Sequence, residues 1–121
     1  MKLKWLRPML WVDDVKTSME YYVEVLGFTF GGHLENWGWG YVIRDDVEFM
    51  FARAPEPAIY NGPQFSGSLY INTDDVDGWW NLLKDKVTIV YPIENFAYQM
   101  REFAIKDCNG YIIQFAQDIS H

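Results

Sequence analysis

Apolar residues follow two different periods along this chain, and the same succession of periods occurs twice. In the first half, Val15, Met19, Tyr22 and Leu26 recur every three or four positions and so fall on one face of a helix. Gly27 is the expected helix end, because a residue without Cβ turns left-handed easily. Short apolar or alternating runs around this segment are typical of strands. The pattern predicts a helix at Lys16–Leu26 and strands at Trp5–Val12, Phe28–Leu34, Trp39–Arg44 and Val47–Arg53.

The second half repeats this order of elements. Val76, Trp79 and Leu83 mark the inner face of a second helix. Pro92 is expected to end the strand before it, since proline cannot donate to a strand ladder. Asn109-Gly110 indicates a hairpin turn, because both residues tolerate positive φ. The expected elements are a helix at Asp77–Lys86 and strands at Gly67–Thr73, Val87–Tyr91, Met100–Lys106 and Tyr111–Gln117.

An aspartate pair opens each predicted helix in the same way. Val12-Asp13-Asp14-Val15 precedes the first helix and Thr73-Asp74-Asp75-Val76 precedes the second. A carboxylate at this place accepts hydrogen bonds from the free amides of the first turn. One β-α-β-β-β unit is therefore written twice, which predicts an α+β fold. We expect a single domain over residues 1–121, with modules at 4–54 and 67–119 and a linker rich in proline at 55–66.

Composition and charge narrow the classes of partner. Hydrophobic residues make up 50% and charged residues 22% of the chain, a globular balance. The net charge of −7 argues against a nucleic-acid partner, which needs a basic face. No apolar run approaches the roughly 20 residues of a membrane span, so no membrane partner is expected. Cys108 is the single cysteine and forms no internal disulfide, which favours a cytoplasmic location.

Two segments carry a family resemblance. One runs from Val12-Asp13-Asp14-Val15 through Tyr21-Tyr22 to Leu26-Gly27-Phe28, and the other is 103–115, Phe-Ala-Ile-Lys-Asp-Cys-Asn-Gly-Tyr-Ile-Ile-Gln-Phe. With the tandem layout, they resemble the vicinal oxygen chelate superfamily, which includes glyoxalases, extradiol dioxygenases and bleomycin-resistance proteins. Cys108 stands where such proteins usually have proline. The resemblance implies two βαβββ modules that form a curved, half-open, eight-stranded barrel-like sheet with two outer helices.

The resemblance also identifies four positions at which the family's enzymes usually hold a divalent metal. They fall at Arg7 and Ser68 in the first strands of the modules and at Met50 and Gln114 in the last strands. Arginine stays cationic, the methionine thioether is a soft ligand, and serine and glutamine are weak neutral donors. We therefore expect no metal and no other cofactor. This set places the chain closest to the metal-free, bleomycin-resistance-like members.

No catalytic arrangement stands out elsewhere. His33 and His121 are the two histidines, and neither has a partner in the pattern that would make it a ligand or a base. Cys108 lies in a turn without an adjacent base. The sequence identifies no catalytic residue and favours a protein that is not an enzyme, while leaving catalysis open.

Aromatic residues dominate the surface that the two modules are expected to enclose. Alternation along the strands from the four metal positions predicts one ligand-binding set. For Trp37, Trp39 and Tyr41, ligand contact and structural packing are both open. The predicted set is Trp5, Arg7, Trp37, Trp39, Tyr41, Glu48, Met50, Ser68, Tyr70, Arg101, Phe103 and Gln114.

Three functions are compatible with this reading. The first is a metal-free binding protein that sequesters a planar or cationic small molecule in an aromatic cleft. The second is an enzyme of the same superfamily that uses no metal or a displaced site. The third is a dimerising module whose cleft is an interface. Tight binding of a small molecule would favour the first function, turnover the second, and neither of these the third. A homodimer is also expected.

Overall fold

Each half of the chain folds as one β-α-β-β-β unit, in the order that the hydrophobic pattern predicts. The computed structural model describes residues 1–54 and 60–121, which divide into the units Met1–Gly62 and Pro63–His121. The boundary lies within the expected linker at 55–66, of which residues 55–59 lie outside the described part. The two units are described separately below.

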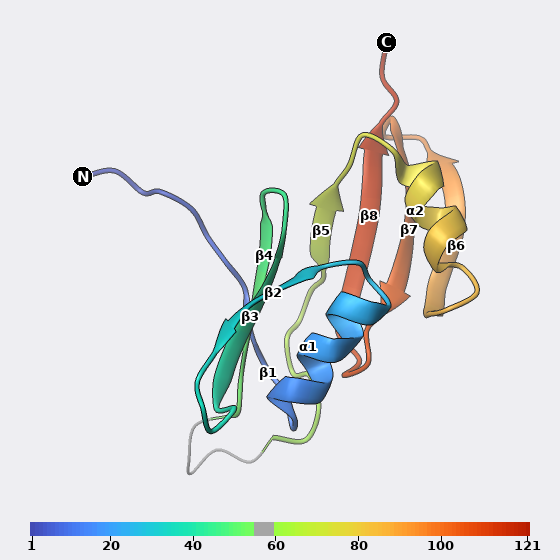
Figure 1. Ribbon diagram of the computed structural model, residues 1–121. Helices are drawn as coiled ribbons and strands as arrows, with labels where there is room; N and C mark the ends of the chain where they lie inside the picture. The colour runs from blue at the N-terminus through green and yellow to red at the C-terminus, as the bar shows by residue number, and fades with distance from the viewer. Residues whose placement is uncertain (55–59) are drawn as a thin grey trace. The chain divides into compact units, whose positions relative to one another are not determined.

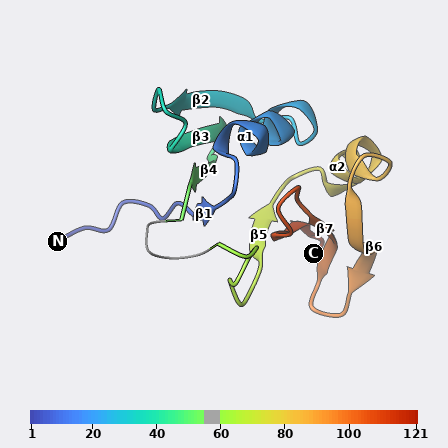
Figure 2. The ribbon, with the colours of Figure 1, turned by 90° about the horizontal axis from the view of Figure 1, so that it is seen from below.

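The first unit consists of one helix and one four-stranded sheet. The strand order is β1-β4-β3-β2, with β1 parallel to β4 and the other pairs antiparallel. Helix α1 packs on one face of this sheet (Figures 1 and 2). The elements are β1 (Met9–Trp11), α1 (Val15–Glu24), β2 (Thr29–His33), β3 (Trp39–Arg44) and β4 (Val47–Ala52).

The second unit has the same connectivity. Its strand order is β5-β8-β7-β6, with β5 parallel to β8, and α2 packs on β7 and β8. We call the face of each sheet that points away from its own helix the helix-free face. The elements are β5 (Leu69–Asn72), α2 (Val76–Leu83), β6 (Thr88–Phe96), β7 (Met100–Lys106) and β8 (Ile112–Asp118).

These elements confirm the α+β class and the repeated βαβββ module. The strands form two separate four-stranded sheets and are not closed into a barrel. No helix in residues 1–54 or 60–121 is long and apolar enough to cross a membrane.

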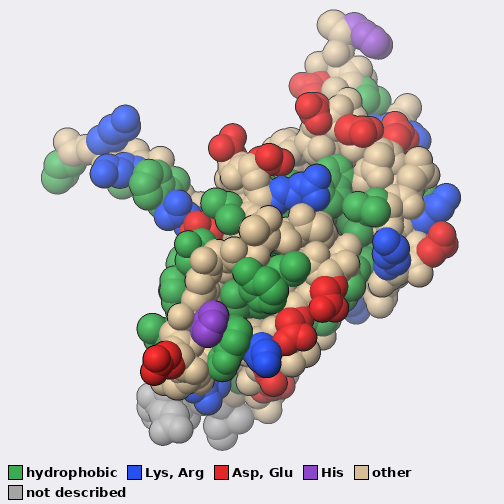
Figure 3. Space-filling model, in the orientation of Figure 1, with side chains coloured by type: hydrophobic (Ala, Val, Ile, Leu, Met, Phe, Trp, Pro, Cys, Tyr) green, Lys and Arg blue, Asp and Glu red, His purple; other side chains and the backbone are tan. Residues whose placement is uncertain are grey.

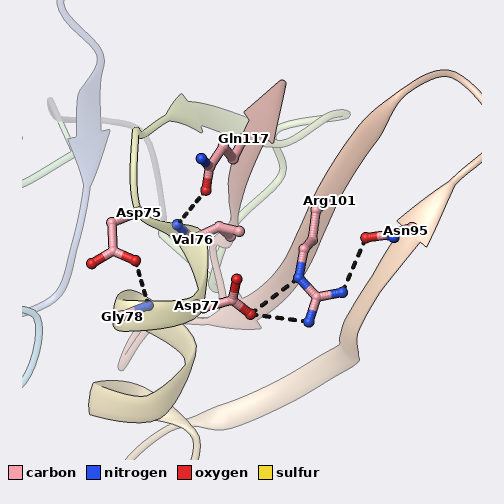
Figure 4. Close-up of polar contacts among 7 residues, drawn as sticks. All are labelled: Asp75, Val76, Asp77, Gly78, Asn95, Arg101 and Gln117. Carbon is pink, nitrogen blue, oxygen red and sulfur yellow. Dashed lines mark hydrogen bonds and ion pairs between the residues drawn. The ribbon is translucent and has the colours of Figure 1, made fainter. Parts of the chain in front are cut away.

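The aspartate pairs cap the helices as expected. The Thr17 amide donates to Oδ1 of Asp14 at 2.9 Å, and the Gly78 amide donates to Oδ1 of Asp75 at 3.0 Å (Figure 4). Each carboxylate thereby satisfies a free amide of its helix's first turn and interacts favourably with the positive end of the helix dipole. The second aspartate of each predicted pair is therefore the N-cap.

Each sheet buries its core against its own helix. In the first unit, the ring of Tyr22 lies 4.8 Å from that of Phe51 and 5.2 Å from that of Phe49, and all three are nearly or fully buried. Gly40 lets α1 approach β3, because a Cβ there would come within 2.4 Å of the Met19 sulfur. In the second unit, Phe103 and Phe115 are fully or nearly fully buried, and their ring centroids lie 5.2 Å apart.

Two strands differ most from their predicted bounds, whereas the others match them or shift by one or two residues at their ends. The first strand begins at Met9 instead of Trp5, and Figure 3 shows basic and apolar side chains along the N-terminal segment that precedes it. Strand β6 does not end before Pro92 but continues to Phe96. It is an edge strand with register shifts between Ile89 and Tyr91 and between Tyr91 and Glu94, and such irregularities accommodate a proline without an N–H.

Candidate functional site

Glu102 is a buried carboxylate in the middle of β7, and neutral side chains hold it. Its exposed fraction is 0%. Its Oε1 accepts hydrogen bonds from the hydroxyls of Tyr70, at 2.9 Å, and Tyr98, at 2.6 Å. Its Oε2 accepts from the Tyr91 hydroxyl and from Nε2 of Gln114, at 3.2 Å from the latter. We call these five residues the Glu102 cluster.

The charge of Glu102 has no opposite charge beside it. Within the described residues, the ion pairs join Arg7 to Glu48, Arg44 to Asp45 and Arg101 to Asp77, and none includes Glu102. Buried charges in proteins are usually paired or coordinate a metal. This carboxylate therefore depends on four neutral donors for its stability.

Strand pairing places the cluster on the helix-free face of the second sheet. Tyr70 pairs with Gln114 in the parallel register of β5 and β8, and Glu102 lies opposite Ala116 across β7 and β8. Residues that lie opposite each other on paired strands point to the same face. Ala116 and Ala104, which lie opposite Glu102 and Gln114 in the ladder of β7 and β8, are fully buried.

Ser68, which immediately precedes β5, continues the same hydrogen-bond network. Its Oγ donates to Oε1 of Gln114 at 2.5 Å, while Nε2 of Gln114 donates to the Tyr91 hydroxyl at 2.7 Å. Both ends of the Gln114 amide therefore have partners, which fixes its orientation. Of the sequence-predicted residues, the structure brings Ser68, Tyr70 and Gln114 together.

Electrostatics keep the carboxylate ionised and the hydroxyls protonated. Burial is the largest influence on Glu102 and raises its pKa, but the four hydrogen bonds together outweigh it, so the pKa lies below its ordinary value. Burial, and then the hydrogen bond to Glu102, raise the pKa of Tyr70 to about 12 and that of Tyr91 to about 12. The hydrogen bond to Glu102 is the main cause that raises the pKa of Tyr98.

Arg101 and Phe103 lie on the opposite face of β7, which corrects their predicted place beside Gln114. Phe103 is 0% exposed, and its ring centroid lies 5.2 Å from those of Trp80 in α2 and Phe115 in β8. Nε and Nη2 of Arg101 donate to Oδ1 of Asp77 in α2 at 3.1 and 3.0 Å (Figure 4). Both side chains hold the sheet to its helix.

The length of the hairpin loop explains this correction. A two-residue turn at Asn109-Gly110 would have placed odd-numbered residues of β7 on the face of Gln114. In the structure the Asp107 amide donates to the Tyr111 carbonyl at 2.8 Å, and Lys106 pairs with Ile112. Gly110 has a φ of +97°, whereas Asn109 is not in the positive-φ region. One additional loop residue exchanges the two faces of β7 relative to β8.

Sequence reasoning missed Glu102, Tyr91 and Tyr98. The alternation predicts Arg101 and Phe103, and not Glu102, on the face of Gln114, although a glutamate between Arg101 and the apolar run Phe103-Ala104-Ile105 is a recognisable signal. Tyr91 is the last residue of the predicted strand Val87–Tyr91, whereas it lies inside β6, which continues to Phe96. Tyr98 lies in the turn between β6 and β7, where alternation gives no indication of direction.

The helix-free face of the first sheet carries a second group of predicted residues. Arg7 forms an ion pair with Glu48, and its guanidinium carbon lies 4.5 Å from the ring centroid of Trp5. Met50 lies opposite Tyr41, whose ring is 5.6 Å from that of Trp39. The structure therefore brings Arg7, Glu48 and Trp5 into one contact group and Trp39, Tyr41 and Met50 into another.

Trp37 has different neighbours. Its ring stacks on His33 at 3.7 Å with planes 6° apart, and Nζ of Lys16 in α1 lies 5.7 Å from its centroid. Its backbone has a φ of +57°, so it lies in a turn outside the alternation of β3. These contacts place Trp37 beside α1 and His33, whereas Trp39 contacts Tyr41.

The side chains at the four superfamily metal positions do not fit a divalent ion. Arg7 brings a positive charge and is paired with Glu48, Met50 offers a thioether, and Ser68 and Gln114 bond to each other. Within residues 1–54 and 60–121, no group of three or more His, Cys, Asp and Glu side chains is placed to hold a metal.

We expect that Zn²⁺ or Ni²⁺ leaves the melting temperature of the protein unchanged. A metal that binds only the native state would add about 2.7 kcal/mol at a hundred times its dissociation constant, which a thermal scan detects readily. The same scan with excess chelator is the control. A clear rise in the melting temperature with either metal would show that the protein does hold a divalent ion.

The fold and this site together define a tandem βαβββ protein of α+β class. A family model described as the Glyoxalase/Bleomycin resistance protein/Dioxygenase superfamily matches residues 4–115, so the chain belongs to this superfamily. Comparison with curated protein sequences gives no match.

Solved structures of the same fold come from proteins of distinct kinds. A glyoxalase/bleomycin resistance protein/dioxygenase from Nocardioides has a TM-score of 0.80 at 14% identity, over 99% of this chain and 86% of its own. The bleomycin-binding protein of Streptomyces verticillus, solved with copper(II)-bleomycin, has a TM-score of 0.71 at 21% identity, over 95% and 96%. A lactoylglutathione lyase from Agrobacterium tumefaciens has a TM-score of 0.72 at 15% identity, over 94% and 92%. At these identities the similarity concerns the fold.

Proposed function

We propose that the protein is a metal-free small-molecule binding protein of the glyoxalase/bleomycin-resistance type, which sequesters a planar, cationic ligand on its aromatic helix-free faces. The observation that carries this proposal is the Glu102 cluster. The buried Glu102 carboxylate supplies a negative charge that no cation among the described residues neutralises. The tyrosines beside it supply rings that a ligand can reach, since Tyr70 is 43% and Tyr98 60% exposed. Aromatic faces and carboxylates both attract cations.

The protonation states in the cluster favour binding over acid–base catalysis. A general acid or base works best when its pKa lies near the operating pH. The pKa of Glu102 is below its ordinary value, which makes it a weak base, and Tyr70 and Tyr91, with pKa values of about 12, are weak acids. These groups serve as fixed charges and donors, so we place binding ahead of metal-independent catalysis.

The first unit supports the same preference for a cation. Because Arg7 is paired with Glu48, it is engaged within the protein and is not the free anchor that an acidic ligand would need. The net charge of −7 steers cations toward the surface. The Streptomyces relative with the same fold binds bleomycin, which makes bithiazole-type compounds reasonable probes.

We expect cationic aromatic compounds, bithiazoles included, to quench tryptophan fluorescence, with an affinity that falls as salt screens the steering charges. Trp39→Ala should weaken this binding by about 1–3 kcal/mol if the indole stacks on the ligand, by analogy with stacking on nucleobases. Trp37→Ala is the matched control. This substitution also removes an indole ring, but one that is stacked on His33. Quenching by small acids, with cations inactive, would instead make Arg7 the anchor of an anionic ligand.

Oligomeric state and location stay predictions. A homodimer should be visible by sedimentation at micromolar concentration, and a monomer there would contradict it. The cytoplasmic location is proposed from the lone cysteine alone.

A further inference from the structure

We propose that Tyr98 is a displaceable cover over Glu102, and that the ligand group which replaces its hydroxyl is an ammonium or guanidinium. This inference rests on the proposed function, because it assigns a chemical class to the ligand of the same helix-free face. Glu102 is fully buried, so a ligand reaches its oxygens only when one of the four donors moves.

Tyr98 is the donor that moves at the lowest cost. Tyr70, Tyr91 and Gln114 belong to the paired strands β5, β6 and β8, whose ladders hold their backbones. Tyr98 belongs to the turn between β6 and β7, in which the Gln99 amide donates to the Phe96 carbonyl at 3.1 Å. Its side chain is 60% exposed. A change in its side-chain torsions uncovers Glu102 without breaking a strand pair.

Two interactions hold Tyr98 in the covering position. Its hydroxyl donates to Oε1 of Glu102 at 2.6 Å, and its ring stacks on Phe96 at 5.4 Å with planes 13° apart. Both interactions are ones that a ligand can replace. An aromatic ligand stacks on Phe96 in the same way, and a cationic N–H donates to Oε1 in place of the hydroxyl.

A cation gains more from this exchange than a neutral donor does. The hydroxyl of Tyr98 already makes a charge-assisted hydrogen bond to the Glu102 carboxylate. An ammonium or guanidinium adds to such a bond the attraction between opposite charges, which is stronger in a site shielded from water than in bulk water. The carboxylate is already buried and oriented by Tyr70, Tyr91 and Gln114, so the ligand does not have to desolvate or order it. A neutral hydroxyl only repeats what Tyr98 already offers, and an anion is repelled.

The test measures the affinity of a matched pair of probes, benzylammonium and neutral benzyl alcohol, by NMR titration at constant ionic strength. The side-chain amide of Gln114 is the local reporter, because its Nε2 contacts Glu102 and Tyr91. In the wild-type protein, benzylammonium should bind more tightly than benzyl alcohol and should shift this resonance. Tyr98→Phe keeps the ring that stacks on Phe96 and removes only the competing hydroxyl.

Tyr98→Phe should raise the affinity for benzylammonium about 3- to 10-fold, the equivalent of one net hydrogen bond. The affinity for benzyl alcohol, whose hydroxyl can donate to the same vacated oxygen, should rise by no more than this, so benzylammonium remains the tighter ligand. Glu102→Gln should abolish the preference for the cation. Asp85→Asn removes the same charge from an exposed residue that follows α2, away from the helix-free face, and it should change neither affinity by more than about twofold, since an exposed charge contributes little.

The outcomes separate this inference from the proposed function. If Tyr98→Phe weakens benzylammonium binding or leaves it unchanged, Tyr98 is a fixed wall of the site and the inference is wrong. If both probes bind equally in every variant, the face binds aromatic molecules without recognising charge, which overturns the inference and keeps the binding function. If neither probe nor any larger cationic aromatic compound shifts the Gln114 resonance, both proposals fail.

Discussion

Phe103→Ala is expected to lower the free energy of unfolding by about 3–5 kcal/mol, the range for truncation of a buried phenylalanine. The Phe103 ring is fully buried between Trp80 of α2 and Phe115 of β8, so its removal leaves a cavity at the contact of helix and sheet. Urea denaturation followed by circular dichroism measures the change. Because the ring lies on the face away from the Glu102 cluster, ligand affinity of the folded variant should stay close to that of the wild type.

Phe65→Ala is the matched control in the same unit. Phe65 is 55% exposed, and an exposed substitution of this kind usually changes stability by less than about 0.5 kcal/mol. If Phe103→Ala were as mild as this control and instead abolished ligand binding, Phe103 would line the site, as the sequence had suggested, and the observed register of β7 would be wrong.

The fold could be predicted because its signals are local and were repeated. Asp14 and Asp75 each act as the N-cap that the two aspartate pairs indicate, and strand β3 has the predicted bounds Trp39–Arg44. The predicted bounds of β6 end at Tyr91, before Pro92, whereas the strand continues to Phe96. A proline is tolerated there because β6 is an edge strand with shifted register, and edge position is a property of the sheet, not of the segment.

The candidate site was harder to predict because it depends on which residues of neighbouring strands point to the same face of the sheet. Ser68, Tyr70 and Gln114 could be grouped because the family resemblance identifies the positions of Ser68 and Gln114, and alternation along the strand adds Tyr70. The structure pairs β5 with β8 and so brings them together. The third strand of the group, β7, is joined to β8 by a hairpin, and one extra loop residue decides whether Glu102 or Phe103 faces Gln114. The Asn109-Gly110 signal marks the turn but does not fix its length.

In the first unit, two members of the predicted set are in contact. Arg7 and Glu48 form an ion pair, in which the Arg7 side chain is 36% exposed. Trp37 shows the opposite case, because its positive φ removes it from the alternation by which it was grouped with Trp39.

Glu102→Gln is expected to lower the free energy of unfolding by about 1–3 kcal/mol at neutral pH, as for loss of hydrogen bonds to a charged group. The amide has the shape of the carboxylate, but its NH₂ cannot accept from the donors that now meet Oε2, and the anionic acceptor is lost. Relief of the buried charge opposes this loss. The lowered pKa of Glu102 decides the sign, because it means that the four hydrogen bonds outweigh burial.

The pH dependence of this difference is a second check on the same residue. A group whose pKa is lower in the folded state contributes stability above its unfolded pKa, near 4.5, and loses it as the pH falls through the folded value. The difference in unfolding free energy between the wild type and Glu102→Gln should therefore be full at pH 7 and shrink below about pH 4.5, while Asp85→Asn stays near the wild type throughout. Urea denaturation at pH 7 and at pH 3 measures both. A Glu102→Gln protein as stable as the wild type at pH 7 would mean that the tyrosines do not hold an anion.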